Sequence, residues 1–315
     1  MNNNYPYFNV LFYFLLLVSS PLQAGSFSSA IVNKTKDITY AGSKKKNYPI
    51  QLLKHALSYD NSTDYQFIDF GKNIPKMREF NLLGKANGID VVIGGATMVR
   101  ERLALPIRFP IMQGLYGWRI ALVHQDNQNI FKSIKSLNNF KKFSALQFHT
   151  WSDSETLLSN DITLIKGTDV KGLYMMLDKK RADYFPRSVL EIDSDLAKHK
   201  HLAIVKEKNM LIWYPKAVYF YVGKNQTALA SSIRRGLELS LSDGSFKTLF
   251  MKYYGDIISK LQAENRHVFK LNNPLLSPLT PLSRAELWLD LSSTLPHQDN
   301  EQISYLVDSP IQSTQ

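Results

Sequence analysis

The chain has 315 residues and contains no cysteine. This absence excludes structural disulfides, thiolate-bound zinc, thiol nucleophiles and lipid attachment through an N-terminal cysteine. The seven histidines show no His-Glu-x-x-His or comparable zinc spacing. His199 and His201 could lie on one face of a strand, but they follow a lysine-rich segment, where an ordinary surface pair is the simpler interpretation. We therefore expect no metal and no other cofactor.

The sequence has no apolar run long enough to cross a bilayer, which takes about 20 residues. Its longest run near the start, residues 11–18, is followed by Ser19-Ser20-Pro21 and by Leu22-Gln23-Ala24 before Gly25. This pattern is typical of a secretory signal peptide, so we expect residues 1–24 to be removed and the protein to be periplasmic. No lysine or arginine precedes the run, so an uncleaved short anchor is the alternative.

Motifs for common catalytic sites are also missing. The chain has no Gly-x-Ser-x-Gly elbow, no Walker loop and no dinucleotide-binding fingerprint after a strand. Lysine and arginine outnumber aspartate and glutamate by 38 to 27, a net charge of +11. The basic clusters are scattered and lack interleaved aromatic residues, so we expect no nucleic acid partner. The charge can instead attract anionic small molecules.

Short apolar strands alternate with amphipathic helices, which predicts an α/β fold of parallel sheets covered by helices. We expect strands at 65–70, 89–94, 144–148, 162–165 and 182–185, with helices at 75–85, 152–158 and 170–179. Two further β-prone stretches, residues 118–123 and 217–222, flank the second block. The simplest topology has two lobes, with the chain crossing between them on these two strands.

Two amphipathic helices follow the second crossing. Residues 225–243 carry an apolar residue at every fourth position, and residues 246–262 continue the pattern on lobe one. A short helical piece follows at 284–291. The predicted organisation is a signal peptide at 1–24, lobe one at 25–117 and 223–295, lobe two with both crossover strands at 118–222, and a polar, disordered tail at 296–315.

The most informative stretch is residues 89–102. A buried strand ends in Gly94-Gly95, and Thr97 and Arg102 follow it. In open α/β sheets, ligands bind at the carboxyl ends of the strands, so these residues lie where a ligand would bind. The pattern Gly-x-Thr-x-x-x-Glu-Arg after a strand resembles the family 3 extracellular solute-binding proteins, the polar amino-acid-binding branch of the type 2 periplasmic binding fold. The resemblance covers roughly residues 30–265.

The resemblance implies roles for several residues. Gly95 would offer backbone groups, Thr97 a hydroxyl, and Arg102 a bidentate fork for an α-carboxylate. In lobe two, the segment with Thr150 and Trp151 follows a strand and precedes a helix. Proteins of this family bind the ligand there through backbone amides at the helix N-terminus.

Arg187 lies in a later segment, residues 181–188, where the family directs a side chain into the cleft. It either binds a second anionic group or pairs with Glu191 one helical turn away. The sequence departs from the family at the acidic residue that holds an α-ammonium, for which only Asp183 or Glu191 is available. Val99 also stands where a second hydroxyl is common. An amino-acid ligand is therefore what the resemblance leads us to expect for this chain.

The resemblance implies a monomeric binding protein rather than an enzyme. It would capture a small carboxylated, amino-acid-like solute between two closing lobes and deliver it to an ABC-type importer in the membrane. One alternative is a sensing protein that docks on a membrane receptor without transport. The other is an enzyme on the same fold, although a lyase would need a second catalytic domain and the segment after Asn273 is too short for one.

Overall fold

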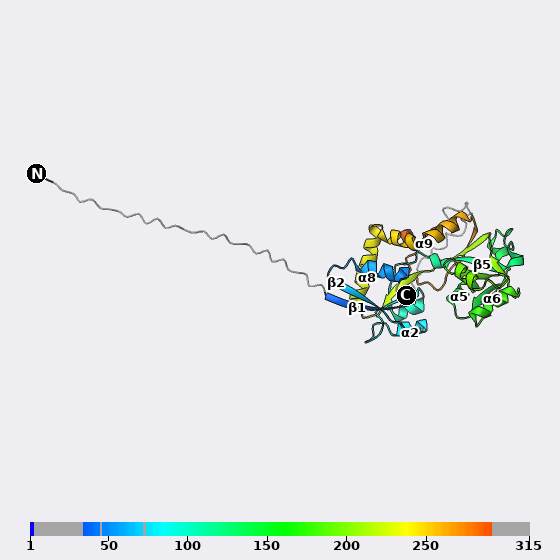
Figure 1. Cartoon of the computed structure of the whole chain (residues 1–315), viewed down its shortest axis with the longest axis horizontal. Coiled ribbons are helices and arrows are strands. Elements are labelled where there is room, and N and C mark those ends of the chain that lie inside the picture. Colours follow the sequence, from blue (N-terminus) through cyan, green and yellow to red (C-terminus); the bar gives the residue numbers. More distant parts are fainter. Residues whose placement is uncertain (3–33, 45, 72–73, 292–315) are drawn as a thin grey trace, which may run out of the picture.

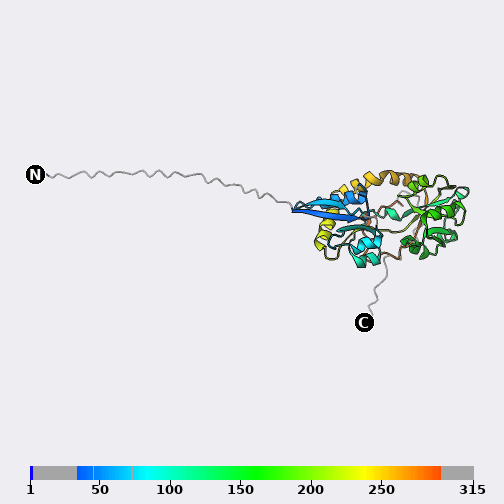
Figure 2. The same cartoon turned by 60° about the horizontal axis from the view of Figure 1, so that its bottom comes forward.

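The computed structural model describes residues 1–2, 34–44, 46–71 and 74–291 (Figure 1). The predicted signal peptide and the predicted polar tail lie outside these residues. Among the described helices, none is both long and apolar enough to cross a membrane. The described residues form two lobes, each built around its own main sheet (Figures 1 and 2).

The first lobe contains a five-stranded sheet in the order β2-β1-β3-β11-β4. Its strands are β1 (Lys34–Ala41), β2 (Thr63–Asp69), β3 (Val91–Gly95), β4 (Leu105–Ile107) and β11 (Val218–Val222). The strands β1, β2 and β3 are parallel, whereas β11 runs antiparallel to both β3 and β4. β11 thereby brings a late part of the chain beside the end of β3.

Helices cover this sheet on two sides. They are α1 (Tyr48–Leu57), α2 (Lys76–Asn81), α3 (Met98–Leu103), α8 (Thr227–Ser242) and α9 (Ser245–Ala263). α1 and α8 approach each other closely at Gly236, where an added Cβ would lie 1.8 Å from the carbonyl oxygen of Ala56. No other residue type fits there without moving one of the two helices.

The second lobe contains the sheet β12-β10-β5-β8, with β9 also paired to β5, and a separate pair of parallel strands. The strands are β5 (Trp118–His124), β8 (Phe185–Ser188), β9 (Ile204–Lys206), β10 (Met210–Trp213) and β12 (His267–Lys270), with the pair β6 (Ala145–Phe148) and β7 (Leu164–Gly167). Its helices are α4 (Leu137–Phe140), α5 (Ser152–Leu158), α6 (Val170–Asp178) and α7 (Ile192–Lys198). Short 3₁₀ helices lie at η1 (Leu115–Gly117), η2 (Gln125–Asn127) and η3 (Ala285–Leu287).

The sheets correct two of the expected lobe boundaries. β11, expected within lobe two, pairs along its length with strands of the first sheet. β12, expected within lobe one, pairs in parallel with β10 of the second sheet. A buried apolar strand fits the middle of either sheet, so its composition does not say which sheet it joins. The chain therefore passes between the sheets at residues 108–117, 214–217 and 264–266, and again after β12.

Candidate functional site

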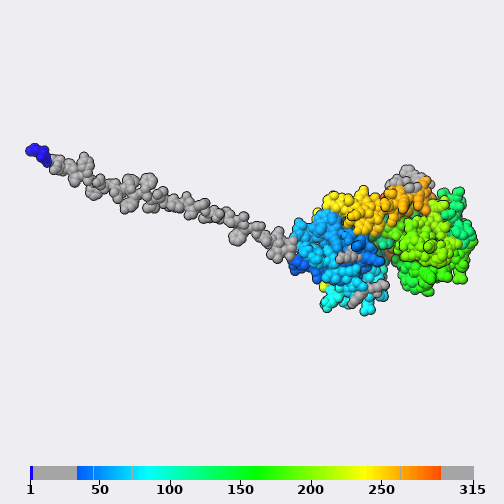
Figure 3. Space-filling view, viewed as in Figure 1, coloured from blue at the N-terminus to red at the C-terminus, as the bar shows by residue number. Residues whose placement is uncertain are grey.

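A cavity of about 1250 Å³ lies between the two lobes. Its walls come from the β3–α3 junction of the first lobe, from α5 and the end of β8 in the second, and from the segments that connect the sheets. In the space-filling view the first lobe, blue to cyan, and the second lobe, green, meet along one boundary (Figure 3). Of the residues predicted from the sequence, Gly95, Thr97, Trp151 and Arg187 line this cavity.

The first-lobe wall presents an arginine, but not the predicted one. Arg100, which is half-buried, donates from Nη1 to the carbonyl oxygen of Gly95 at 2.8 Å, and its backbone N–H donates to Thr97 Oγ1 at 3.3 Å. Its guanidinium also lies 5.7 Å from the ring centre of Phe80. Burial lowers the pKa of Arg100 from its ordinary value, although Tyr221 and Glu79 oppose this shift. No carboxylate among the described residues forms an ion pair with Arg100.

Arg102 lies elsewhere: it is exposed and does not line the cavity. Thr97 caps α3, so Arg100 and Arg102 occupy the third and fifth positions of the same short helix. Two residues of a helix separated by two positions point about 200° apart, so only one of them can face the cleft. The structure therefore replaces Arg102 with Arg100 as the arginine of the first-lobe wall.

Of the two second-lobe residues predicted to contact the ligand, only one lines the cavity. Thr150 is exposed and lies outside the cavity lining. Trp151 lines the cavity and is half-buried; its ring lies 5.0 Å from the guanidinium of Arg187, a cation–π distance, and stacks on Phe185. The aromatic residue, and not the threonine, belongs to the wall.

Arg187 is 7% exposed and is paired on its own lobe. Its Nε donates to Asp195 Oδ2 at 2.6 Å, and its Nη2 lies 3.1 Å from Glu191 Oε2. The predicted pairing with Glu191 is thus present, and Asp195 adds a second carboxylate. Of the two acidic candidates, Glu191 lines the cavity, whereas Asp183 accepts hydrogen bonds from the backbone and hydroxyl of Ser144 away from it.

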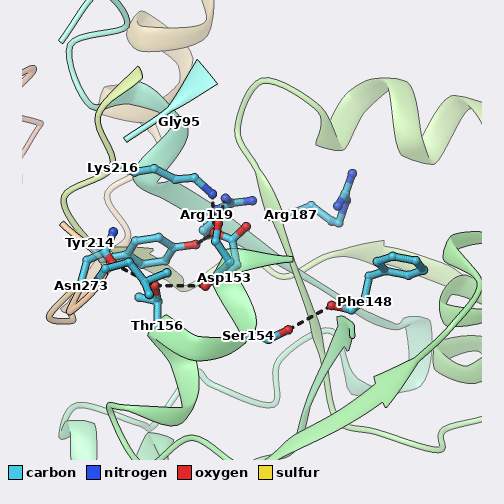
Figure 4. A network of polar contacts seen from close by, with 12 residues as sticks. Gly95, Arg119, Phe148, Asp153, Ser154, Thr156, Arg187, Tyr214, Lys216 and Asn273 are labelled. Carbon is cyan, nitrogen blue, oxygen red and sulfur yellow. Dashed lines mark hydrogen bonds and ion pairs between the residues drawn. The ribbon is translucent and has the colours of Figure 1, made fainter. Parts of the chain in front are cut away.

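A buried charge cluster at the start of α5 escaped the sequence analysis (Figure 4). Asp153 Oδ1 accepts from Arg119 Nη2 at 2.7 Å, from Lys216 Nζ at 2.6 Å and from the hydroxyl of Tyr214. Asp153 and Arg119 are 7% and 5% exposed. The available signal was an arginine inside the apolar strand 118–123, because a charge in a buried strand requires a partner.

The pKa values of this cluster follow from burial and mutual attraction. Burial alone would raise the pKa of Asp153, but Arg119 and Lys216 outweigh it and hold that pKa well below its ordinary value. Burial alone would lower the pKa of Arg119, yet Asp153 raises it. For Lys216, burial prevails over the attraction of Asp153 and lowers the pKa. The arrangement keeps Asp153 ionised and leaves Lys216 incompletely compensated.

α5 also binds two of the segments that connect the sheets. Tyr214 and Lys216 belong to segment 214–217, which joins β10 to β11. Thr156 of α5 donates to Asn273 Oδ1 at 3.2 Å, and Asn273 Nδ2 donates to the carbonyl oxygen of Pro215 at 2.8 Å. The charge cluster is thus part of the junction between the lobes.

No family model and no curated protein matches the sequence. The structure is similar to the probable amino-acid ABC transporter extracellular-binding protein ytmK from Bacillus subtilis, with a TM-score of 0.50, 18% identity, and coverage of 71% of this chain and 98% of that one.

Two further similar structures are an ancestral arginine-binding protein bound to arginine and a Streptococcus mutans structure of glutathione import. Their TM-scores are 0.44 and 0.46, with 16% and 15% identity; they cover 70% and 71% of this chain, and 98% and 95% of theirs. The similarity to ytmK shows that the chain has the two-lobed α/β fold of the periplasmic binding proteins, as its resemblance to the family 3 extracellular solute-binding proteins predicts.

Proposed function

We propose that the protein captures a small carboxylated, amino-acid-like solute between its two lobes, with Arg100 binding the carboxylate. The observation that carries this proposal is that Arg100 lies half-buried in the cleft wall without a described carboxylate partner. A guanidinium matches a carboxylate through two parallel hydrogen bonds, and the match is stronger away from water. The fold, shared with a probable amino-acid ABC transporter extracellular-binding protein, supports the same proposal.

Binding would proceed by closure of the lobes about the segments that connect the sheets. Closure excludes water from the cleft and strengthens each polar contact inside it. Gly95 fixes the guanidinium of Arg100 through its carbonyl oxygen, and Thr97 fixes the start of α3. Trp151, opposite, would cover the apolar part of the solute. Each role uses a residue already ordered in the wall, which reduces the entropy lost on binding.

The test compares two arginines on one short helix. Calorimetric titration of the chain from Gly25 onward with amino acids and organic acids would identify a ligand, and the titration is then repeated on Arg100→Ala and on Arg102→Ala. We expect Arg100→Ala to weaken binding at least about tenfold, because a charge-assisted hydrogen bond contributes about 1.5–3 kcal/mol. Arg102→Ala, the matched control, should bind within about twofold of the wild type. Equal effects of the two substitutions would refute the assignment to Arg100.

The proposed setting is the periplasm, with a monomer delivering its solute to an ABC-type importer. We propose removal of residues 1–24, which mass spectrometry of the exported protein tests directly, because the mature chain should begin at Gly25. Retention of the first 24 residues would favour the short anchor. Growth on the identified solute separates transport from sensing: deletion of the gene should slow uptake, and normal uptake with altered transcription would favour a sensor.

A further inference from the structure

The cleft is lined by more cationic than acidic side chains. Among the residues that the structure describes, six cationic and four acidic side chains line it. The cationic residues are Lys44, Lys76, Arg100, Arg119, Arg187 and Lys216. The excess matters only where the charges are withdrawn from water, because exposed charges are screened by solvent and salt. Each buried cation must therefore be compared with its partners.

Two of the cations are fully compensated, and one lies in solvent. Lys76 Nζ lies 2.5 Å from Glu79 Oε2. Arg187 has two carboxylates within 3.1 Å, as described above. Lys44 is exposed. None of these three side chains needs an anion from outside.

The remaining three cations, Arg100, Arg119 and Lys216, have only one ion-paired carboxylate between them among the described residues, Asp153. Arg100 has no described ion-pair partner, and both Arg119 and Lys216 bind the same oxygen of Asp153. By direct ion pairs, one positive charge remains on Arg100 and a second on the Arg119–Lys216 pair, on which Glu191 acts only from beyond ion-pair distance. A charge held out of water without compensation is costly, and an anionic ligand removes that cost.

Both positive charges belong to residues near the Gly95 end of β3. The Arg100 guanidinium binds the carbonyl oxygen of Gly95. Lys216 lies two residues before Val218, which pairs with Gly95 in the antiparallel register of β3 and β11. Figure 4 shows Lys216 extending past Gly95 toward Asp153 and Arg119. Arg100, Arg119 and Lys216 all line the same cavity.

We propose that the solute carries two carboxylates, one bound by Arg100 and the other by the Arg119–Lys216 pair. This inference rests on the proposed function and narrows it to dicarboxylates, including dicarboxylic amino acids. Asp153 then acts as the residue that holds Arg119 and Lys216 in place, and its single charge leaves the pair able to accept a second anion.

The experiment measures dissociation constants for two matched pairs of solutes, glutamate with glutamine and glutarate with its monoamide. In the wild type, each dicarboxylate should bind at least about tenfold more tightly than its amide. In Lys216→Met this preference should fall to about threefold or less, because Arg119 is then neutralised by Asp153. Lys208→Met, which removes an exposed lysine outside the cleft lining, is the control and should keep the full preference.

The outcomes separate the two proposals. If dicarboxylates and amides bind equally, and Lys216→Met changes nothing while Arg100→Ala still weakens binding at least about tenfold, the second carboxylate is refuted and the proposed function stands. If neither pair binds and no other carboxylated solute does, both proposals fail. Circular dichroism of Lys216→Met establishes that the variant is folded, and Lys216→Arg, which keeps the charge, should keep part of the preference.

Discussion

The two walls of the cleft differ in how their charged residues are paired. On the first-lobe wall, the six-residue helix α3 has no buried residue, and Arg100, its arginine in the cleft, binds the carbonyl oxygen of Gly95 and lies over the ring of Phe80. The second-lobe wall holds Asp153, Arg119 and Arg187, each less than 10% exposed and each ion-paired. One wall keeps a charge free for a ligand, and the other uses its charges mainly on itself.

This difference separates stability from binding. Removal of one partner from a buried ion pair leaves the other charge uncompensated and destabilises the folded state. Removal of an arginine that has no carboxylate partner leaves no such charge behind. Substitutions in the second wall should therefore act first on folding, and substitutions in the first wall on the ligand.

The largest effect is expected for Asp153→Ala. The substitution leaves Arg119 and Lys216 buried next to each other without a carboxylate, and it should lower the free energy of unfolding by about 3–5 kcal/mol. Urea denaturation measures the loss. The matched control is Asp183→Ala, which removes a half-buried carboxylate that binds only Ser144. A smaller loss for Asp153→Ala than for Asp183→Ala would contradict the contrast between the walls.

The contribution of the same cluster to stability should be lost as the pH is lowered. The folded-state pKa of Asp153 lies below its usual value of 3.8, so its contribution to stability is complete above that pH and is lost as the pH falls toward the folded-state value. The wild type should therefore lose up to about 1.4 kcal/mol more per pH unit below pH 4 than Asp153→Asn. Parallel pH profiles of the two proteins would show that Asp153 is not held ionised by its partners.

Thr97→Ala tests the first wall. Loss of the cap should cost α3 about 1 kcal/mol, because the backbone N–H of Arg100 loses its acceptor. Since no residue of α3 is buried, the helix can open locally without global unfolding. Hydrogen exchange at Arg100 should accelerate about fivefold while the urea midpoint stays unchanged. Thr97→Ser keeps the hydroxyl and should exchange as the wild type does.

The smallest effect is expected for Gly95→Ala. The added Cβ would lie 3.2 Å from Arg100 Nη1, so the guanidinium must move by a few tenths of an ångström. We expect ligand affinity to fall on the order of twofold to fivefold, because the hydrogen bonds of the guanidinium depend on its direction. Gly255→Ala is the control: its Cβ makes an ordinary 3.5 Å contact with Met251, and affinity should not change.

The sequence predicts the elements with strong periodicity. The helix at 152–158 has the expected bounds, and β5 differs from the expected strand by one residue. β1 was missed because its first half is polar and exposed, which hides the alternation of a strand. α1 was missed although Asn47 and Pro49 mark its start, a signal typical of a helix N-terminus.

The site is predictable only in part, for two physical reasons. The motif at the end of β3 locates Gly95 and Thr97, but the phase of α3 depends on which residue caps it, and that choice decides between Arg100 and Arg102. The Asp153 cluster joins residues from β5, α5 and segment 214–217. Such partners are far apart along the chain, so their pairing is a property of the packed lobes and not of any local pattern.

The position of Lys216 bears on how long a solute remains bound. Lys216 belongs to segment 214–217, which joins the two sheets and lies in neither of them. A carboxylate held there stays in place while the walls separate, so opening first breaks its contact with Arg100. In the proposed dicarboxylate complex, Lys216 would retain the solute through brief openings, and its lifetime would be set by release from Lys216. A solute with one carboxylate lacks this second anchor and should leave at the first opening.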